Sequence, residues 1–266
     1  MKIFTVVGAR PQFIKAAPLS RAIRQRHEEF LVHTGQHYDD AMSAVFFRQL
    51  GIPAPDVNLG VGSGHHGAQT AAMLQGIEAL LLQEKPHCML VYGDTNSTLA
   101  GALAASKLHI PIAHVEAGLR SYNRAMPEEI NRVLTDHLSA LLFCPTDVAV
   151  NNLAQEGITE GVIMCGDIMV DAVLQNVARA RQESTILQHL SIAPKTYLAA
   201  TIHRPANTDD AQALQAIIDA FATAPLPVIF AAHPRTQKAL AQHGIQLHGN
   251  ARLIEPLGYL DMLALV

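Results

Sequence analysis

Carboxylates and cations that could carry acid–base chemistry come directly after short apolar runs of the sequence. Asp94 and Glu116 each follow such a run, and Arg10 and Lys15 follow the first one. Carboxylates exchange protons at neutral pH, whereas guanidinium and ammonium groups hold phosphate oxygens. Arg10 and Lys15 stand where a helix begins, a position that disfavours cations unless an anion is bound there. The pattern therefore predicts proton transfer beside a phosphate-binding site.

Each of these residues also has a purely structural interpretation. Asp94 could cap the helix that follows it, and Glu116 could pair with Arg120. Glu128 follows a proline at a helix start, where acidic residues are ordinary. We favour the chemical interpretation because several strand ends deliver ionisable residues to one edge of a parallel sheet, where open α/β sheets bind ligands.

The elements that must position these residues are strands alternating with helices. The aliphatic runs predict strands at 2–7, 30–34, 87–92, 111–115, 140–144, 162–165, 197–202, 228–232 and 252–254. Helical patterns separate them, including one at 40–50, and parallel strands need such crossovers. We expect an α/β fold with two doubly wound domains.

The domain boundary is expected near the polar helical stretch that begins at 167. We assign 1–168 to a first domain that carries the carboxylates and 169–266 to a linker and a second domain. The apolar helix at 259–266 is short, and the second domain has only three predicted strands. We therefore expect this second domain to be incomplete at its C-terminal end, and the chain to be inactive by itself.

Composition excludes several other classes of protein. The chain has 266 residues and a net charge of −4, so nothing draws it as a whole to nucleic acid or anionic lipid. No apolar stretch approaches the ~20 residues that span a bilayer. The three cysteines are odd in number and widely spaced, which favours buried free thiols in the cytoplasm. The histidines and cysteines lack metal-site spacing, and no dinucleotide motif occurs, so we expect neither metal nor cofactor.

The sequence resembles a known enzyme family. The resemblance rests on six motifs in a fixed order: Gly8-x-Arg10-Pro11-x3-Lys15, Thr34-Gly35-Gln36-His37, Tyr92-Gly93-Asp94-Thr95, His114-Val115-Glu116-Ala117-Gly118-Leu119-Arg120, Pro127-Glu128-Glu129-x-Asn131-Arg132 and Thr201-x-His203-Arg204. Together they resemble the non-hydrolysing UDP-N-acetylglucosamine 2-epimerases. The resemblance implies a GT-B-like architecture, in which two Rossmann-like, doubly wound domains face a cleft and the second, 169–266 here, binds the nucleotide of a UDP-sugar. It also implies a cytoplasmic homodimer and the interconversion of UDP-N-acetylglucosamine and UDP-N-acetylmannosamine through a 2-acetamidoglucal intermediate.

The resemblance also implies roles for individual residues. The catalytic positions of the family are matched by Asp94, Glu116, Glu128 and His203, and the substrate-binding positions by Arg10, Lys15, Arg132, Arg204 and Met262. An activator site in some bacterial members includes positions that match Gln36, Arg204 and His233. Ala68 stands where those members have an arginine, which argues against activation here. Which carboxylate removes the proton stays open between Asp94 and Glu116.

Several alternative functions stay open. The stretch 121–126 resembles a subgroup that acts on UDP-2,3-diacetamido-2,3-dideoxyglucuronic acid. A GT-B-type glycosyltransferase would have the same two-domain architecture, and a hydrolysing relative would release N-acetylmannosamine. An inactive binding protein would catalyse no reaction.

Overall fold

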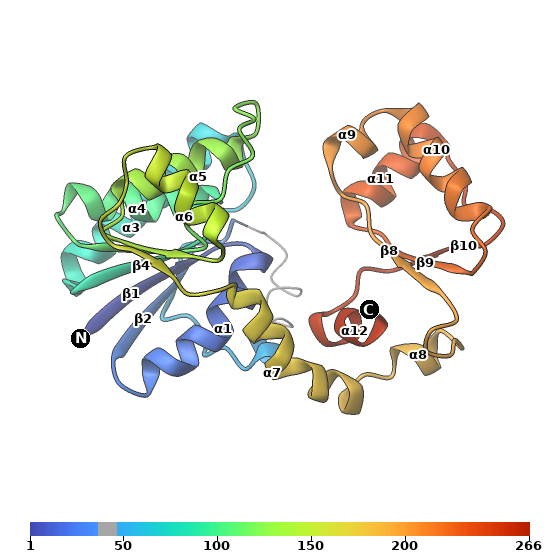
Figure 1. The fold of residues 1–266 in the computed structure, drawn as a ribbon, viewed down its shortest axis with the longest axis horizontal. Helices are drawn as coiled ribbons and strands as arrows, with labels where there is room; N and C mark the ends of the chain where they lie inside the picture. Colours follow the sequence, from blue (N-terminus) through green and yellow to red (C-terminus); the bar gives the residue numbers. More distant parts are fainter. Residues whose placement is uncertain (37–46) are drawn as a thin grey trace. The chain divides into compact units, whose positions relative to one another are not determined.

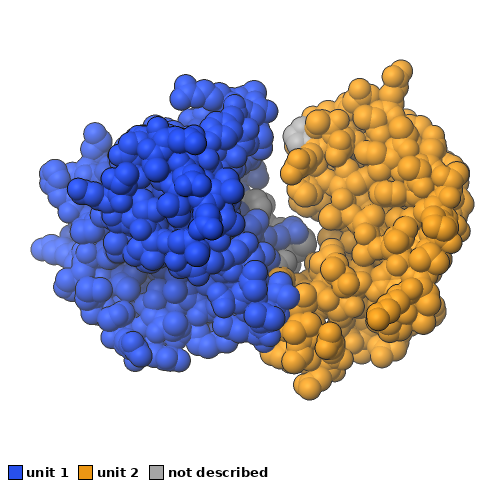
Figure 2. Space-filling model, viewed as in Figure 1, with its two compact units in different colours: residues 1–175 blue, residues 176–266 orange. Residues whose placement is uncertain are grey.

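The computed structural model describes residues 1–36 and 47–266, and the chain divides into two compact units (Figure 2). These units comprise residues 1–175 and 176–266. Most of the helix predicted at 40–50 lies outside the described residues, as does His37 of the second motif.

A parallel sheet forms the centre of the first unit. Its strands are β1 (Lys2–Val7), β2 (Glu28–His33), β3 (Val57–Asn58), β4 (Cys88–Tyr92), β5 (Ile112–Val115), β6 (Leu141–Cys144) and β7 (Val162–Met164). Their order across the sheet is β3-β2-β1-β4-β5-β6-β7. The two-residue strand β3 is absent from the sequence-based prediction, whereas the others lie where the aliphatic runs predict them.

Helices cover both faces of this sheet. They are α1 (Arg10–Arg24), α3 (His66–Glu84), α4 (Asn96–Lys107), α5 (Pro127–Leu138), α6 (Asp147–Gln155) and α7 (Ile168–Glu183). In Figure 1, α3 to α6 lie on one face, and α1 and α7 lie on the other. Buried side chains such as Phe4, Met73 and Val91 form the core between the sheet and α3 and α4. The apolar strands are therefore covered on both sides, as a parallel sheet requires.

Local sequence explains where the helices next to the site begin. The Thr95 side chain accepts a hydrogen bond from the Thr98 amide and caps α4, so the alternative role of Asp94 as the cap is wrong. Thr146 caps α6 in the same way, and Pro127 occupies the first turn of α5. The helix α1 continues through Pro18 to Arg24 without a break.

The second unit contains a smaller parallel sheet. Its strands are β8 (Leu198–Ala200), β9 (Val228–Ala231) and β10 (Ala251–Ile254), in the order β10-β9-β8. The helices are α8 (Ile186–His189), α9 (Pro205–Thr208), α10 (Ala211–Ala222), α11 (Pro234–His243) and α12 (Tyr259–Leu265). Figure 1 shows α10 and α11 on one face and α8 and α12 on the other. The predicted α/β fold with two parallel sheets is confirmed.

The three cysteines are free, as predicted, but they are not all buried. Cys144 is buried, Cys88 is half-buried and Cys165 is exposed. Cys165 follows the edge strand β7, which has a neighbour on one side only, so the apolar run there does not imply burial.

Two glycines near β6 and β7 provide a test of backbone packing. Both have positive φ, +68° at Gly161 and +80° at Gly157. A Cβ at Gly161 would lie 2.0 Å from the carbonyl oxygen of Ala140, whereas nothing lies within 4 Å of one at Gly157. We expect Gly157→Ala to lower the free energy of unfolding by about 1–2 kcal/mol, the cost of a left-handed alanine.

Gly161→Ala should lower the free energy of unfolding by about 1–3 kcal/mol more than its matched control, Gly157→Ala. The reason is that the backbone at Gly161 must also move away from the added methyl group. Urea unfolding of both variants measures the difference. Equal losses would show that the close approach to Ala140 is not a real constraint.

Candidate active site

The carboxyl ends of three neighbouring strands bring together most of the first unit's predicted site residues. β1 pairs with β4 and β4 with β5, all in parallel, so their carboxyl ends lie at one edge of the sheet. Arg10 and Lys15 lie on α1 after β1, Asp94 follows β4, and Glu116 follows β5. This edge is where open α/β sheets bind ligands.

Lys15 and Glu116 form an ion pair in this edge. The Lys15 ammonium contacts the Glu116 carboxylate, and both side chains are largely buried. A Cβ at Gly93 would lie 3.2 Å from Lys15 Nζ, so the missing side chain leaves room for the ammonium group. The alternative pairing of Glu116 with Arg120 is wrong, because Arg120 binds Asp136 and Glu156 instead.

Asp94 has its own cation on α5. Its carboxylate pairs with the Arg132 guanidinium, and the Asn131 side chain donates to the Asp94 backbone carbonyl at 3.0 Å. Arg132 also lies 3.5 Å from a Glu129 carboxylate oxygen. The two candidate carboxylates are therefore each paired with a cation, and Gly93, which directly precedes Asp94, borders the Lys15–Glu116 pair.

The two glutamates at the start of α5 differ in their surroundings. Glu129 is buried and accepts hydrogen bonds from the Ser121 amide and hydroxyl and from the Tyr122 amide. Burial raises the pKa of Glu129, but these donors and the Arg132 charge outweigh it and hold the pKa below its usual value. Glu128 is exposed and forms no hydrogen bond or ion pair with residues in the described ranges. It lies one turn before Arg132, on the same side of α5.

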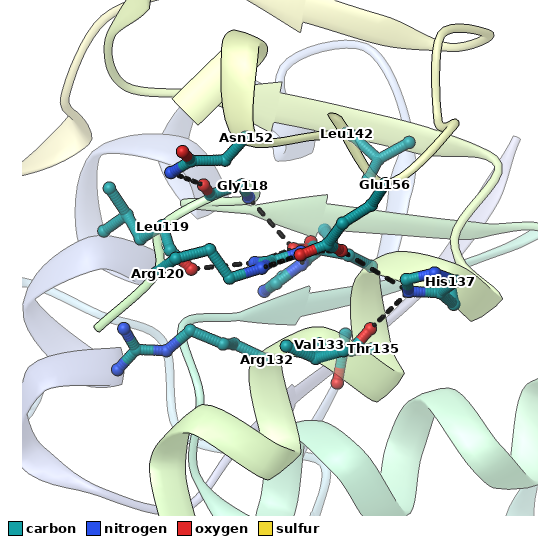
Figure 3. A network of polar contacts seen from close by, with 12 residues as sticks. Gly118, Leu119, Arg120, Arg132, Val133, Thr135, His137, Leu142, Asn152 and Glu156 are labelled. Carbon is teal, nitrogen blue, oxygen red and sulfur yellow. Dashed lines mark hydrogen bonds and ion pairs between the residues drawn. The ribbon is translucent and has the colours of Figure 1, made fainter. Parts of the chain in front are cut away.

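A buried polar network supports the turn that follows β5. Arg120 donates to both oxygens of Glu156 at 2.7 Å (Figure 3) and to Asp136 at 2.7 Å. Asp136 also accepts from the Gly118 amide at 3.1 Å. Burial raises the pKa of Asp136, but its bonds to His114 and Arg120 hold that pKa below its ordinary value. The turn carrying Glu116 is thereby fixed to α5 and α6.

Sequence reasoning missed this network. In the sequence, His114 is one member of a motif and Asp136 belongs to no motif. The available signal was an aspartate, Asp136, in the last turn of a helix, where the helix dipole disfavours a negative charge that has no partner.

Gln36, predicted at an activator site, lies beyond β2. Its side-chain oxygen accepts from the Ser97 amide at 3.1 Å and from the Ser97 hydroxyl at 2.6 Å. Ser97 in turn contacts the Thr34 hydroxyl. Gln36 is therefore attached to the first turn of α4, at the same edge of the sheet as Asp94.

The remaining predicted residues belong to the second unit. His203 and Arg204 follow β8 and are exposed, and His233 follows the neighbouring strand β9. His233 caps α11, its ring accepting from the Arg235 amide at 3.2 Å. Met262 lies half-buried in α12. The first three therefore share one edge of the smaller sheet.

Among residues 1–36 and 47–266, no three His, Cys, Asp or Glu side chains are grouped so that they could hold a metal ion. Within the same ranges, no helix combines the length and apolar character that crossing a membrane requires.

Comparison with known proteins identifies relatives over the whole chain. The sequence profile of a family described as UDP-N-acetylglucosamine 2-epimerase matches residues 21–266. A UDP-N-acetylglucosamine 2-epimerase homolog of Methanococcus maripaludis is 54% identical, over 100% of this chain and 76% of its own length. The UDP-2,3-diacetamido-2,3-dideoxy-D-glucuronate 2-epimerase of Pseudomonas aeruginosa is 50% identical, over 100% of this chain and 75% of its own.

A solved structure gives the same result. The crystal structure of the Methanocaldococcus jannaschii UDP-GlcNAc 2-epimerase, in complex with UDP-GlcNAc and UDP, is similar with a TM-score of 0.91 and 44% identity. The similarity covers 100% of this chain and 76% of that one. The chain therefore belongs to the UDP-N-acetylglucosamine 2-epimerase family, a family of isomerases.

Proposed function

We propose that the protein interconverts UDP-N-acetylglucosamine and UDP-N-acetylmannosamine by inverting C2 of the sugar. The observation that carries this proposal is the pair of carboxylates, Asp94 and Glu116, at adjacent strand ends, each with its own cation. The UDP-GlcNAc and UDP bound in the similar M. jannaschii structure support a UDP-sugar as the substrate.

Elimination of UDP makes inversion at C2 feasible. The C2 proton has no neighbouring carbonyl, so its direct removal would leave an unstabilised carbanion. We propose that the C1–O bond breaks with its electron pair going to UDP, while a base takes the C2 proton. The C2–H electrons form the C1–C2 double bond of a 2-acetamidoglucal. A proton then reaches C2 on the opposite face as UDP adds back to C1.

This cycle needs a proton acceptor and a proton donor on opposite faces of the sugar. We propose Asp94 and Glu116 for these two tasks, with Glu128 as the third catalytic carboxylate. Glu116 also lines a cavity of 300 Å³ with Phe143 and Pro145, which supports access of a ligand to it.

Cations must hold the diphosphate as it leaves. We propose that Arg10, Lys15 and Arg132 from the first unit bind the substrate and stabilise the negative charge of the departing diphosphate. From the second unit we propose that His203 is catalytic at the diphosphate, that Arg204 binds substrate, and that Met262 contacts the uracil. We propose that Gln36 and His233 belong to an activator site. This site lacks the arginine of the regulated family members, because Ala68 stands in its place.

A second candidate substrate is UDP-2,3-diacetamido-2,3-dideoxyglucuronate. It is favoured by the 50% identity with the P. aeruginosa 2-epimerase that is named for this compound, over the whole chain. The same elimination would invert C2 of either sugar, so the chemistry proposed for the carboxylates is common to both candidates.

Solvent exchange tests the reaction and the substrate together. We expect the protein, at its full natural length, to introduce deuterium at C2 when it is incubated in D2O with the correct UDP-sugar alone. Exchange without an acceptor separates an epimerase from a glycosyltransferase, and product NMR separates it from a hydrolase. No exchange with either UDP-sugar would refute the proposal.

Substitution of the carboxylates tests their roles. Asp94→Asn and Glu116→Gln should each lower kcat about 10²- to 10⁴-fold, the usual loss when a general acid or base is removed. Glu160→Gln, at an exposed position, is the matched control and should keep the native rate.

Deuterium exchange by the two variants shows which carboxylate acts on which face of the sugar. The variant that lacks the base for one epimer should lose both exchange and inversion of that epimer. The variant that lacks only the opposite acid should still exchange C2 without inverting it. Native rates in both variants would exclude this pair as the catalytic carboxylates.

We also propose that the protein is a cytoplasmic homodimer. Ile130 and Leu134 are exposed one turn apart on α5, and with Tyr122 they line a cavity of 740 Å³, which supports an association surface there. Light scattering should give twice the 28.7 kDa mass of the chain.

Leu134→Glu should shift the dimer to monomer, because it places a charge on the apolar surface of α5. Leu174→Glu, at an exposed leucine of α7, is the matched control and should remain dimeric. A native protein with the mass of one chain would contradict the proposed dimer.

A further inference from the structure

The ring of His114 is fully buried, and both of its nitrogens face hydrogen-bond acceptors. Nε2 lies 2.7 Å from the carbonyl oxygen of Gly93, and Nδ1 lies 2.7 Å from Oδ1 of Asp136. A peptide carbonyl oxygen only accepts, so Nε2 must carry a hydrogen. The charge of the ring then depends on which atom, Nδ1 or Asp136, carries the hydrogen between them.

The other partners of Asp136 place that hydrogen on the ring. Its Oδ2 accepts from the Gly118 amide at 3.1 Å and from the Arg120 guanidinium at 2.7 Å. Donors of this kind stabilise the anionic carboxylate, and an anionic Asp136 can only accept from Nδ1. With a hydrogen on each nitrogen, the imidazole is a cation.

Charge balance in the buried cluster leads to the same result. The charged groups around the ring are Asp136 from α5, Arg120 from the turn after β5 and, beyond Arg120, Glu156 at the end of α6. Glu156 is partly exposed and also lies 3.9 Å from the exposed ring of His137. Cys144 of β6 lies near Asp136, but burial raises the pKa of its thiol to about 11, so it is neutral. Within the fully buried part, the Asp136 anion thus lies between two cations, Arg120 and a protonated His114.

We propose that His114 is an imidazolium that positions the two catalytic carboxylates by joining the turns that carry them. Gly93 directly precedes Asp94, and Gly118, held through Asp136, lies two residues after Glu116. The identity of Asp94 and Glu116 as catalytic groups rests on the proposed function. Because both ring nitrogens are occupied, His114 is a positioning residue and does not touch the substrate.

The protonation of the ring is measurable without any activity. In the native protein with ¹⁵N-labelled histidine, both His114 nitrogens should show protonated chemical shifts at pH 7.5. The His114→Asn spectrum identifies the resonances. A neutral His114 at pH 7.5 would overturn the proposal.

Two variants separate the two contacts of the ring. His114→Asn retains a donor that can reach Asp136 but loses the bond to Gly93, whereas His114→Gln retains a donor that can reach Gly93. We expect His114→Asn to lower kcat roughly 10- to 100-fold with little change in KM, the loss typical of a charged hydrogen bond. The kcat of His114→Gln should fall less, and His189→Asn, at an exposed position, is the matched control that should keep the native rate.

The outcomes distinguish failure of this inference from failure of the proposed function. A folded His114→Asn with native kcat, or with a change in KM alone, would overturn the positioning role. If the native protein catalyses no C2 exchange, the proposed function fails, while the ¹⁵N spectra still decide the charge of His114. Thermal unfolding of each variant establishes that it is folded before its kinetics are compared.

Discussion

Parallel pairing of β1 with β4 and of β4 with β5 is the constraint on which the proposed chemistry depends. A parallel strand returns only through a crossover, so each of these strands ends in a turn at the same edge of the sheet. Those turns bring Lys15 to Glu116 although the two residues lie far apart in the sequence. Gly93, on the strand between them, leaves the space in which the two side chains meet.

Four carboxylates of the first unit differ in the number of hydrogen-bond donors that they bind. Glu129 and Asp136 are buried and each accepts several hydrogen bonds, which hold their pKa values below the ordinary ones. Such groups resist protonation and are suited to fixing the backbone. Asp94 and Glu116 have a cation each and remain partly accessible. This difference explains why Glu129, although it lies beside Glu128 in the same motif, is a structural group.

The sequence was sufficient to predict the alternation of strands and helices and the residues at the strand ends, because hydrophobic periodicity and strand polarity are local properties. It could not predict which partner each charge takes. Arg120 is four residues from Glu116, yet it binds Asp136 and Glu156, because the turn after β5 directs it toward α5 and α6. The partners of Asp136 and the two residues of β3 could not be predicted either, since each depends on contacts with residues distant in the sequence.

The buried cluster around His114 and the two carboxylate–cation pairs have complementary roles in the proposed reaction. His114, Asp136 and Arg120 are buried beneath the turns and hold one another through ion pairs, so nothing in this cluster needs to change when substrate reacts. Proton uptake by Asp94 or Glu116, in contrast, removes the negative charge that holds Arg132 or Lys15. This happens as the C1–O bond breaks and the departing diphosphate gains negative charge. A cation released by its carboxylate is thus available to the leaving group at the moment when that group needs it.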